Sequence, residues 1–138
     1  MKFLLDTNII SDMMQNPQGR AMKQLLASLQ RDPQAAVCTS VVVDCELQFG
    51  LTKVPSTKRS DAYKNTIKHI EVLPFNIDAV THYATLRTEL ERAGTPIGPN
   101  DTFIAAHTLA QDCTLVTDNE DEFKRVAGLK VENWLKTA

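Results

Sequence analysis

The stretch Lys2-Phe3-Leu4-Leu5-Asp6-Thr7-Asn8 decides the fold of this chain. Its first four residues contain no turn former and three of them are large and apolar, which predicts a short buried strand. Asp6 follows at once and precedes a second apolar run, so a helix N-cap accounts for it when it is taken alone. Whether or not Asp6 caps a helix, its carboxylate is expected at the carboxyl end of a strand, where the chain leaves the core.

Similar short runs alternate with helical segments along the 138 residues. Strands are predicted over residues 35–39, 71–74, 113–117 and 129–131, and helices over residues 22–31, 41–51, 55–68, 76–90, 102–111 and 120–126. Ser40 is predicted to cap the second of these helices, and Gly94 to follow the end of the fourth. This alternation predicts one α/β domain over residues 1–138, a three-layer α/β/α sandwich around a mostly parallel sheet.

The overall charge does not favour nucleic acid as a partner, because the formal net charge is −2. One local group of basic residues is either a solvated helix face or an RNA-contacting surface. It consists of Lys53, Lys58, Arg59, Lys64 and Lys68. No apolar stretch is long enough to span a membrane and no secretory signal is present, so a cytoplasmic protein with no membrane partner is expected.

Four acidic residues, Asp6, Glu46, Asp101 and Asp118, stand at strand ends or on helices. Glu46 shares a helix face with Val43 and Phe49, so its carboxylate either reaches water at the edge of an apolar stripe or needs a cation or an arginine. Asp101 opens a helix and Asp118 ends a strand, and a cap and a turn explain them one at a time.

The chemical argument depends on these acids converging. Carboxylates about 4 Å apart repel by roughly 4 kcal/mol at an effective dielectric near 20, and a divalent cation relieves that repulsion. Oxygen ligands without histidine or cysteine suit Mg²⁺ or Mn²⁺. Such ions activate water for phosphoryl chemistry.

Other kinds of site have less support in the sequence. The three cysteines are dispersed and form no C-x-x-C pair, which argues against a disulfide framework or a zinc site. His69, His82 and His107 are scattered, with no nucleophile elbow, and are interpreted as structural or surface residues. No phosphate-binding or dinucleotide glycine motif occurs.

Taken together, the motifs resemble those of the PIN-domain ribonucleases, and most closely the VapC toxins of bacterial VapBC toxin–antitoxin modules. The resemblance is carried by Leu4-Leu5-Asp6-Thr7-Asn8, Glu46, Pro96-Ile97-Gly98-Pro99-Asn100-Asp101, Ile104-Ala105-Ala106-His107, Val116-Thr117-Asp118-Asn119 and Phe123. It covers nearly the whole chain, through Glu132-Asn133-Trp134.

The resemblance implies roles for particular residues. Asp6, Glu46 and Asp101 would be catalytic acids that hold an essential Mg²⁺ or Mn²⁺, with Asp118 as a fourth acid and ligand. Asp121 and Glu122 also lie near the fourth position and remain alternatives to Asp118. The supporting polar groups would be Thr7, Asn8, Ser40 and Asn119.

The resemblance also implies an activity and partners. The chain would be the toxin of a type II toxin–antitoxin module, an endoribonuclease that cuts RNA, often tRNA, with metal-activated water. A VapB-like antitoxin would silence it, and it would form a homodimer. The Pro-Ile-Gly-Pro-Asn-Asp stretch over residues 96–101 is similar to that of the branch that cuts initiator tRNA in its anticodon stem-loop.

Two functions outside the nucleases are alternatives. An aspartyl-phosphate phosphohydrolase also begins with an aspartate after its first strand, but its D-x-D motif would need an acid where this chain has Asn8. A non-catalytic receiver-like module is also a small α/β domain with an acidic metal pocket. It would need an aspartate after the third strand, where this chain has Phe75 and Asn76.

Overall fold

The computed structural model describes residues 1–136, which are built around a five-stranded sheet. The strands are β1 (Lys2–Leu5), β2 (Ala36–Ser40), β3 (Glu71–Leu73), β4 (Thr114–Val116) and β5 (Lys130–Glu132). They lie in the order β3-β2-β1-β4-β5, and each neighbouring pair is parallel. The predicted α/β class is therefore confirmed, with the described sheet parallel throughout.

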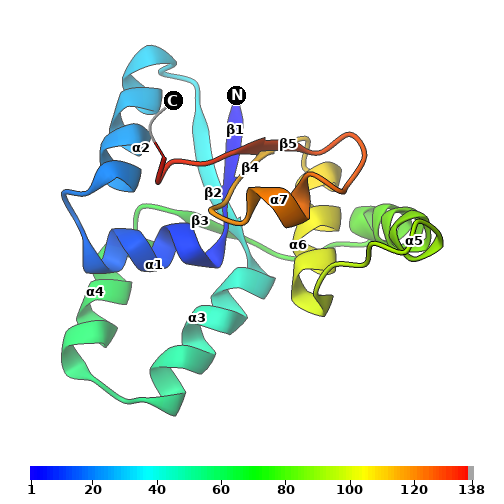
Figure 1. The fold of residues 1–138 in the computed structure, drawn as a ribbon. Coiled ribbons are helices and arrows are strands. Elements are labelled where there is room, and N and C mark those ends of the chain that lie inside the picture. The colour runs from blue at the N-terminus through cyan, green and yellow to red at the C-terminus, as the bar shows by residue number, and fades with distance from the viewer. Residues whose placement is uncertain (137–138) are drawn as a thin grey trace.

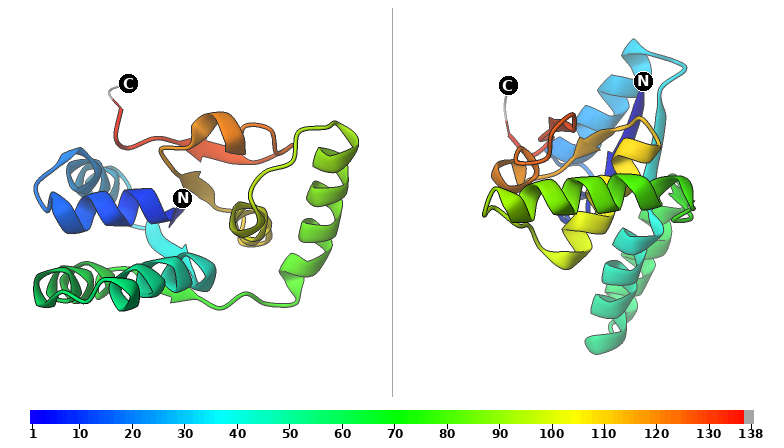
Figure 2. Two further views of the ribbon diagram at one scale, coloured as in Figure 1. Left: turned by 60° about the horizontal axis from the view of Figure 1, so that its bottom comes forward. Right: turned by 90° about the vertical axis from the view of Figure 1, so that its right-hand side faces the viewer.

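Helices cover both faces of this sheet, as the sandwich prediction requires. They are α1 (Thr7–Gln15), α2 (Arg20–Arg31), α3 (Val41–Lys53), α4 (Thr57–Ile67), α5 (Asp78–Arg92), α6 (Pro99–Ala110) and α7 (Glu120–Phe123). Figure 1 shows α1 to α4 on one side of the strands and α5 to α7 on the other, and the left-hand view of Figure 2 separates α1 to α4 from α5 and α6. None of the described helices is long and apolar enough to cross a membrane.

The core explains why the first strand and the helix after it form where they do. Leu4, Leu5, Ile9 and Ile10 have no exposed surface. Each such side chain contributes about 1.5–3 kcal/mol when it is fully buried. The apolar run therefore holds the end of β1 rigidly, and Asp6 starts from a fixed point.

The strand order places a topological switch point between β1 and β4. From β1 the chain moves to β2 and β3 on one side, and then returns to β4 on the other side of β1. The backbone N–H of Asp6 donates to the carbonyl of Val116 over 2.9 Å, which ties the carboxyl ends of β1 and β4 together. In open α/β sheets such a switch point is where ligands bind.

The element boundaries differ from the predicted ones mainly around the turn-rich segment that precedes α6. Helix α6 starts at Pro99 rather than Thr102, because proline is well suited to the first helical position. Asp101 therefore lies inside the first turn of α6. Ser40 caps α3 by accepting from the N–H of Val42, and Gly94 adopts a φ of 72° after α5, as expected.

Candidate active site

Asp6 lies at the switch point and is held by short hydrogen bonds to both carboxylate oxygens. One oxygen accepts from the N–H of Thr7 over 2.8 Å, so the residue does cap α1. The other oxygen accepts from the hydroxyl of Thr117 over 2.7 Å. The side chain is only 4% exposed, and this burial raises its pKa despite the two donors. Asp6 can therefore cap α1 and also belong to a cluster of acids.

Glu46 approaches Asp6 from α3. The hydroxyl of Thr7 donates to one of its carboxylate oxygens over 2.8 Å, which connects it to the residue next to Asp6. Its negative charge contributes to the raised pKa of both Asp6 and Asp101. Glu46 is half-buried, whereas Phe49 on the same face is 66% exposed, so the predicted apolar stripe is an open surface at this end.

Asp101 approaches from the first turn of α6, and the neighbouring carboxylates affect its pKa strongly. Its pKa is raised to about 7, first by burial and then by the negative charges of Asp6, Glu122 and Glu46. A hydrogen bond with Glu122 adds to the increase. Because of this raised pKa, Asp101 is partly protonated near neutral pH.

Glu122, from α7, is the fourth acid of this cluster. Its carboxylate accepts from the N–H of Gly98 over 2.8 Å and from the side chain of Asn119. Burial raises its pKa, but these donors and the hydrogen bond with Asp101 outweigh that effect, so the net pKa is lowered. Of the two hydrogen-bonded carboxyl groups, Asp101 is therefore the one whose protonation is favoured.

The side chain of Asp118 is bonded away from these acids. Its side chain is exposed and accepts from the amide of Asn133 over 3.0 Å, while its backbone N–H donates to Asn8. The charges that raise the pKa of Asp101 come from Asp6, Glu122 and Glu46. The structure thus brings together three of the four acids named from the sequence, and Glu122 rather than Asp118 completes the set. Asp121 is exposed.

The predicted supporting residues divide into two groups. Thr7, Asn8 and Asn119 each donate to one of the clustered acids, Asn8 to Asp6 over a longer 3.5 Å. Ser40 instead contacts the buried ring of His107, with 2.7 Å between Oγ and Nδ1, so its observed contacts are structural. Sequence reasoning missed Thr117, whose hydroxyl bridges Asp6 and the N–H of Asn119.

The donor set matches the chemistry of a hard divalent cation. Four carboxylates and the hydroxyls around them supply only oxygen, as Mg²⁺ and Mn²⁺ prefer. Within residues 1–136 no three acidic, cysteine or histidine side chains form a ready-made ligand group. Glu46 and Glu122 are instead turned to protein donors, an arrangement that reduces carboxylate repulsion.

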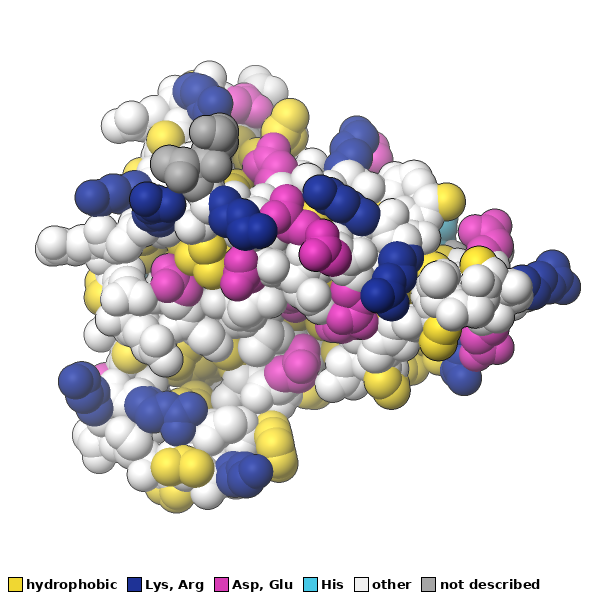
Figure 3. Space-filling model, in the orientation of Figure 1, with side chains coloured by type: hydrophobic (Ala, Val, Ile, Leu, Met, Phe, Trp, Pro, Cys, Tyr) yellow, Lys and Arg dark blue, Asp and Glu magenta, His cyan; other side chains and the backbone are white. Residues whose placement is uncertain are grey.

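The surface around the cluster is mixed in charge. On the face shown in Figure 3, Asp and Glu side chains gather across the middle of the molecule, with Lys and Arg around them and on the projecting arm of α3 and α4 below. The ion pairs of the described residues join other acids, such as Arg87 with Glu91 and Lys136 with Glu120.

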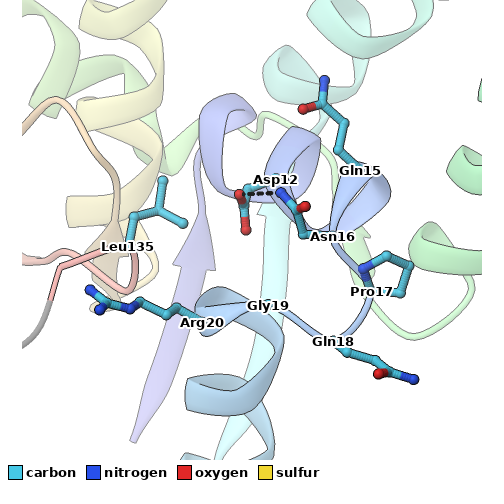
Figure 4. Close-up of a pocket in the computed structure, with 8 residues that line it drawn as sticks. All are labelled: Asp12, Gln15, Asn16, Pro17, Gln18, Gly19, Arg20 and Leu135. Atoms are coloured by element: carbon cyan, nitrogen blue, oxygen red, sulfur yellow. Dashed lines mark hydrogen bonds between the residues drawn. The ribbon is translucent and has the colours of Figure 1, made fainter.

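A separate hollow of about 660 Å³ lies between the α1–α2 turn and the C-terminal segment. Figure 4 shows Asp12 there, hydrogen-bonded to Asn16 over 2.9 Å, with Arg20 and Leu135 also lining the hollow. It holds one carboxylate and none of the clustered acids, so it does not belong to the candidate site.

A parallel α/β sandwich with acids gathered at the switch point of its sheet is a framework for metal-dependent phosphoryl chemistry. Residues 3–129 match the family model for the PIN domain, and the chain belongs to the PIN-domain family.

Its relatives identify the branch of that family as the VapC ribonucleases. The chain is 35% identical to the tRNA(fMet)-specific endonuclease VapC of Shigella flexneri, over 97% of this chain and 98% of that protein. It is 36% identical to Ribonuclease VapC2 of Rickettsia felis, over 99% of this chain and all of that protein. A crystal structure of VapBC2 from Rickettsia felis, bound to a promoter DNA fragment, contains a chain with the same fold. It superposes with a TM-score of 0.87 at 34% identity, covering 97% of this chain and 99% of that one.

Proposed function

We propose that this protein is the toxin of a type II toxin–antitoxin module and an endoribonuclease that hydrolyses RNA with the help of Mg²⁺ or Mn²⁺. The observation that carries the proposal is the gathering of acids at the switch point, where Thr7 and Thr117 hold Asp6 and Glu46, and the Asp101 and Glu122 carboxyl groups share a hydrogen bond. An aspartyl-phosphate enzyme or a receiver-like module gains no support from the family match, since the related proteins are ribonucleases.

The proposed ligands are Asp6, Glu46 and Asp101. Glu122 is favoured over Asp118 as the fourth acid, because it shares a hydrogen bond with Asp101 whereas Asp118 is exposed and bonded to Asn133. When bound, the divalent cation activates water and offsets the negative charge of the phosphodiester. Replacing one carboxylate in this set by an amide removes both a ligand and part of the repulsion.

The residues of the chain prepare this site in distinct ways. Thr117 and the N–H of Thr7 fix both oxygens of Asp6, and the Thr7 hydroxyl orients Glu46. Asp101, whose pKa is raised, must be ionised before its carboxylate can act as a ligand, and it shares a hydrogen bond with Glu122. Binding of a cation at these acids would therefore compete with protonation of Asp101.

The substrate and partners are proposed by analogy with the relatives. The Shigella flexneri protein is named a tRNA(fMet)-specific endonuclease. We extend that specificity, with the anticodon stem-loop of initiator tRNA as the site, to this chain. The Rickettsia felis structure is of a VapBC complex, which supports a VapB-like antitoxin as partner. A homodimer, a cytoplasmic location and a single PIN domain over residues 1–138 complete the proposal.

Cleavage of RNA by the purified protein, freed of antitoxin, tests the proposal. Total tRNA is incubated with wild-type protein in Mg²⁺ or in EDTA, and the fragment ends are mapped. Discrete fragments only in Mg²⁺, with ends in an anticodon loop, are the expected result. Intact tRNA after incubation with folded protein in Mg²⁺ would contradict the tRNA assignment, and survival of messenger and ribosomal RNA as well would contradict the nuclease itself.

A further inference from the structure

An apolar cleft adjoins the acidic cluster between α3 and α6. Its volume is about 470 Å³. The lining residues are Val42, Cys45, Glu46, Phe49, Phe75, Asn100 and Phe103. Glu46 belongs to both the cleft and the acid cluster, and Asn100 directly precedes Asp101. A group in this cleft therefore lies beside the proposed cation site.

One wall of the cleft is a rigid aromatic surface. The ring of Phe103 stacks on Tyr83 with 4.6 Å between centroids and an interplanar angle of 21°. It also meets the ring of Phe75 edge-on, with centroids 5.6 Å apart. Aromatic contacts of this kind fix ring orientation. Phe103 is nevertheless 37% exposed, so part of its surface remains free for a ligand.

Phe49 is an exposed aromatic side chain with a cation beside it. Its ring is 66% exposed, and the ammonium of Lys53 lies 5.8 Å from its centroid. Folding gains little from an aromatic ring that stays in water. Stacking surfaces next to positive charge are how proteins bind single-stranded nucleic acid, with the ring contacting a base and the cation a phosphate.

The cleft also offers a polar group for the edge of a base. The side chain of Asn100 supplies both a donor and an acceptor. The other lining residues are apolar apart from Glu46, which accepts from Thr7 at the acid cluster. One flat, partly apolar group with a polar edge suits this lining.

We propose that the cleft binds one unpaired nucleobase of the RNA substrate, next to the phosphodiester that is cut, with Phe49 as its main stacking surface. This inference rests on the proposed function and gives a physical reason why the cut would fall in an unpaired part of the RNA, such as the anticodon loop. A base in a duplex is stacked and paired and cannot enter such a cleft without being unstacked.

A matched series at position 49 separates stacking from apolar contact. Phe49→Trp keeps a π-face, whereas Phe49→Leu keeps an apolar side chain without one. Stacking on an aromatic side chain changes affinity by roughly 5- to 160-fold per base. We expect Phe49→Leu to lower kcat/KM for a single-stranded RNA at least about tenfold, mainly through KM, and Phe49→Trp to stay near wild type. The thermal midpoints of the three proteins should agree closely.

The substrate supplies the second half of the test. A set of RNAs carries an abasic nucleotide at successive positions around the cut. At one of these positions, the abasic nucleotide should lower the cleavage rate of wild type and leave that of Phe49→Leu unchanged. The two proteins should then cut this RNA at equal rates. RNA with 2-aminopurine at that position, mixed with wild type in EDTA, should lose fluorescence as the base stacks, and this loss should be absent with Phe49→Leu.

The outcomes distinguish this inference from the proposed function. If wild type cuts RNA but Phe49→Leu cuts equally well and the 2-aminopurine signal does not change, the cleft inference is overturned and the nuclease stands. If Phe49→Leu loses activity together with dimer mass in light scattering, and no abasic position equalises the proteins, the cleft contacts a second copy instead. If wild type cuts no RNA, the nuclease fails, and the fluorescence measurement in EDTA still decides whether the cleft binds a base.

Discussion

Replacing Asp101 by asparagine should stabilise the metal-free protein while removing its response to metal. The pKa of Asp101 is raised from an ordinary 3.8 to about 7, so folding works against its ionised form. A group whose pKa is raised on folding favours the folded state at low pH, and this contribution is lost as the pH rises through about 7. An asparagine side chain at this position would carry no charge and would avoid that loss.

The size of the effect follows from the shift. The difference between 3.8 and about 7 corresponds to roughly 4 kcal/mol before screening. Asp101 is only half-buried, so we take about half of this, roughly 2 kcal/mol. For a domain of this size that is an increase of about 5 °C or more in Tm near pH 8. The increase should be less than half as large near pH 5, where Asp101 of the wild type already holds its proton.

Thermal unfolding of wild type and Asp101→Asn, at both pH values in EDTA and in Mg²⁺, measures this directly. Mg²⁺ should raise the Tm of wild type at the higher pH and leave that of Asp101→Asn nearly unchanged, because a ligand stabilises only the state that binds it. The reasoning is refuted if Asp101→Asn is less stable than wild type to the same extent at both pH values, since that would mean a structural role without carboxylate crowding.

Three further results are expected. Glu122→Gln should reduce tRNA cleavage at least about tenfold while Asp118→Asn stays near wild type, since removing an interaction with the reacting group costs that much or more; a larger loss in Asp118→Asn would restore Asp118 as the fourth acid. Thr117→Val should lower stability by about 1–3 kcal/mol, because a buried oxygen of Asp6 loses its donor, and Thr117→Ser should recover most of it in denaturant unfolding. The affinity for Mg²⁺ should rise nearly tenfold per pH unit up to about pH 7 and then level off, as Asp101 loses its proton; calorimetry showing no pH dependence would contradict its raised pKa.

Much of the fold could be predicted because it follows local periodicity. The run ending at Asp6 and the alternation of strands and helices predicted the parallel sandwich. Helix α6 was placed too late because its first turn contains Pro99 and Asn100, which are also turn residues. Local patterns therefore predicted which elements form better than where α6 begins.

The sequence predicted site residues best where their place at the end of a strand or the start of a helix decides their position. Asp6 and Asp101 follow from a strand end and a helix start. Asp118 lies before the short helix α7 and Glu122 lies within it, and the choice between them depends on tertiary contacts that the sequence does not display. Asn119 followed three residues later by Glu122, the spacing of an N-cap and a glutamate, is a sequence signal for Glu122 that the sequence analysis did not use.

The measurement that tests the central claim most directly is the rate of tRNA cleavage as a function of Mg²⁺ concentration for wild type, Asp6→Asn and Glu46→Gln, with circular dichroism to verify that each protein is folded. We predict a rate that rises with Mg²⁺ and saturates for wild type, and a loss of at least about a hundredfold in both variants. Cleavage by wild type in EDTA, or undiminished cleavage by either folded variant, would contradict the assignment of these carboxylates to a metal-dependent nuclease site.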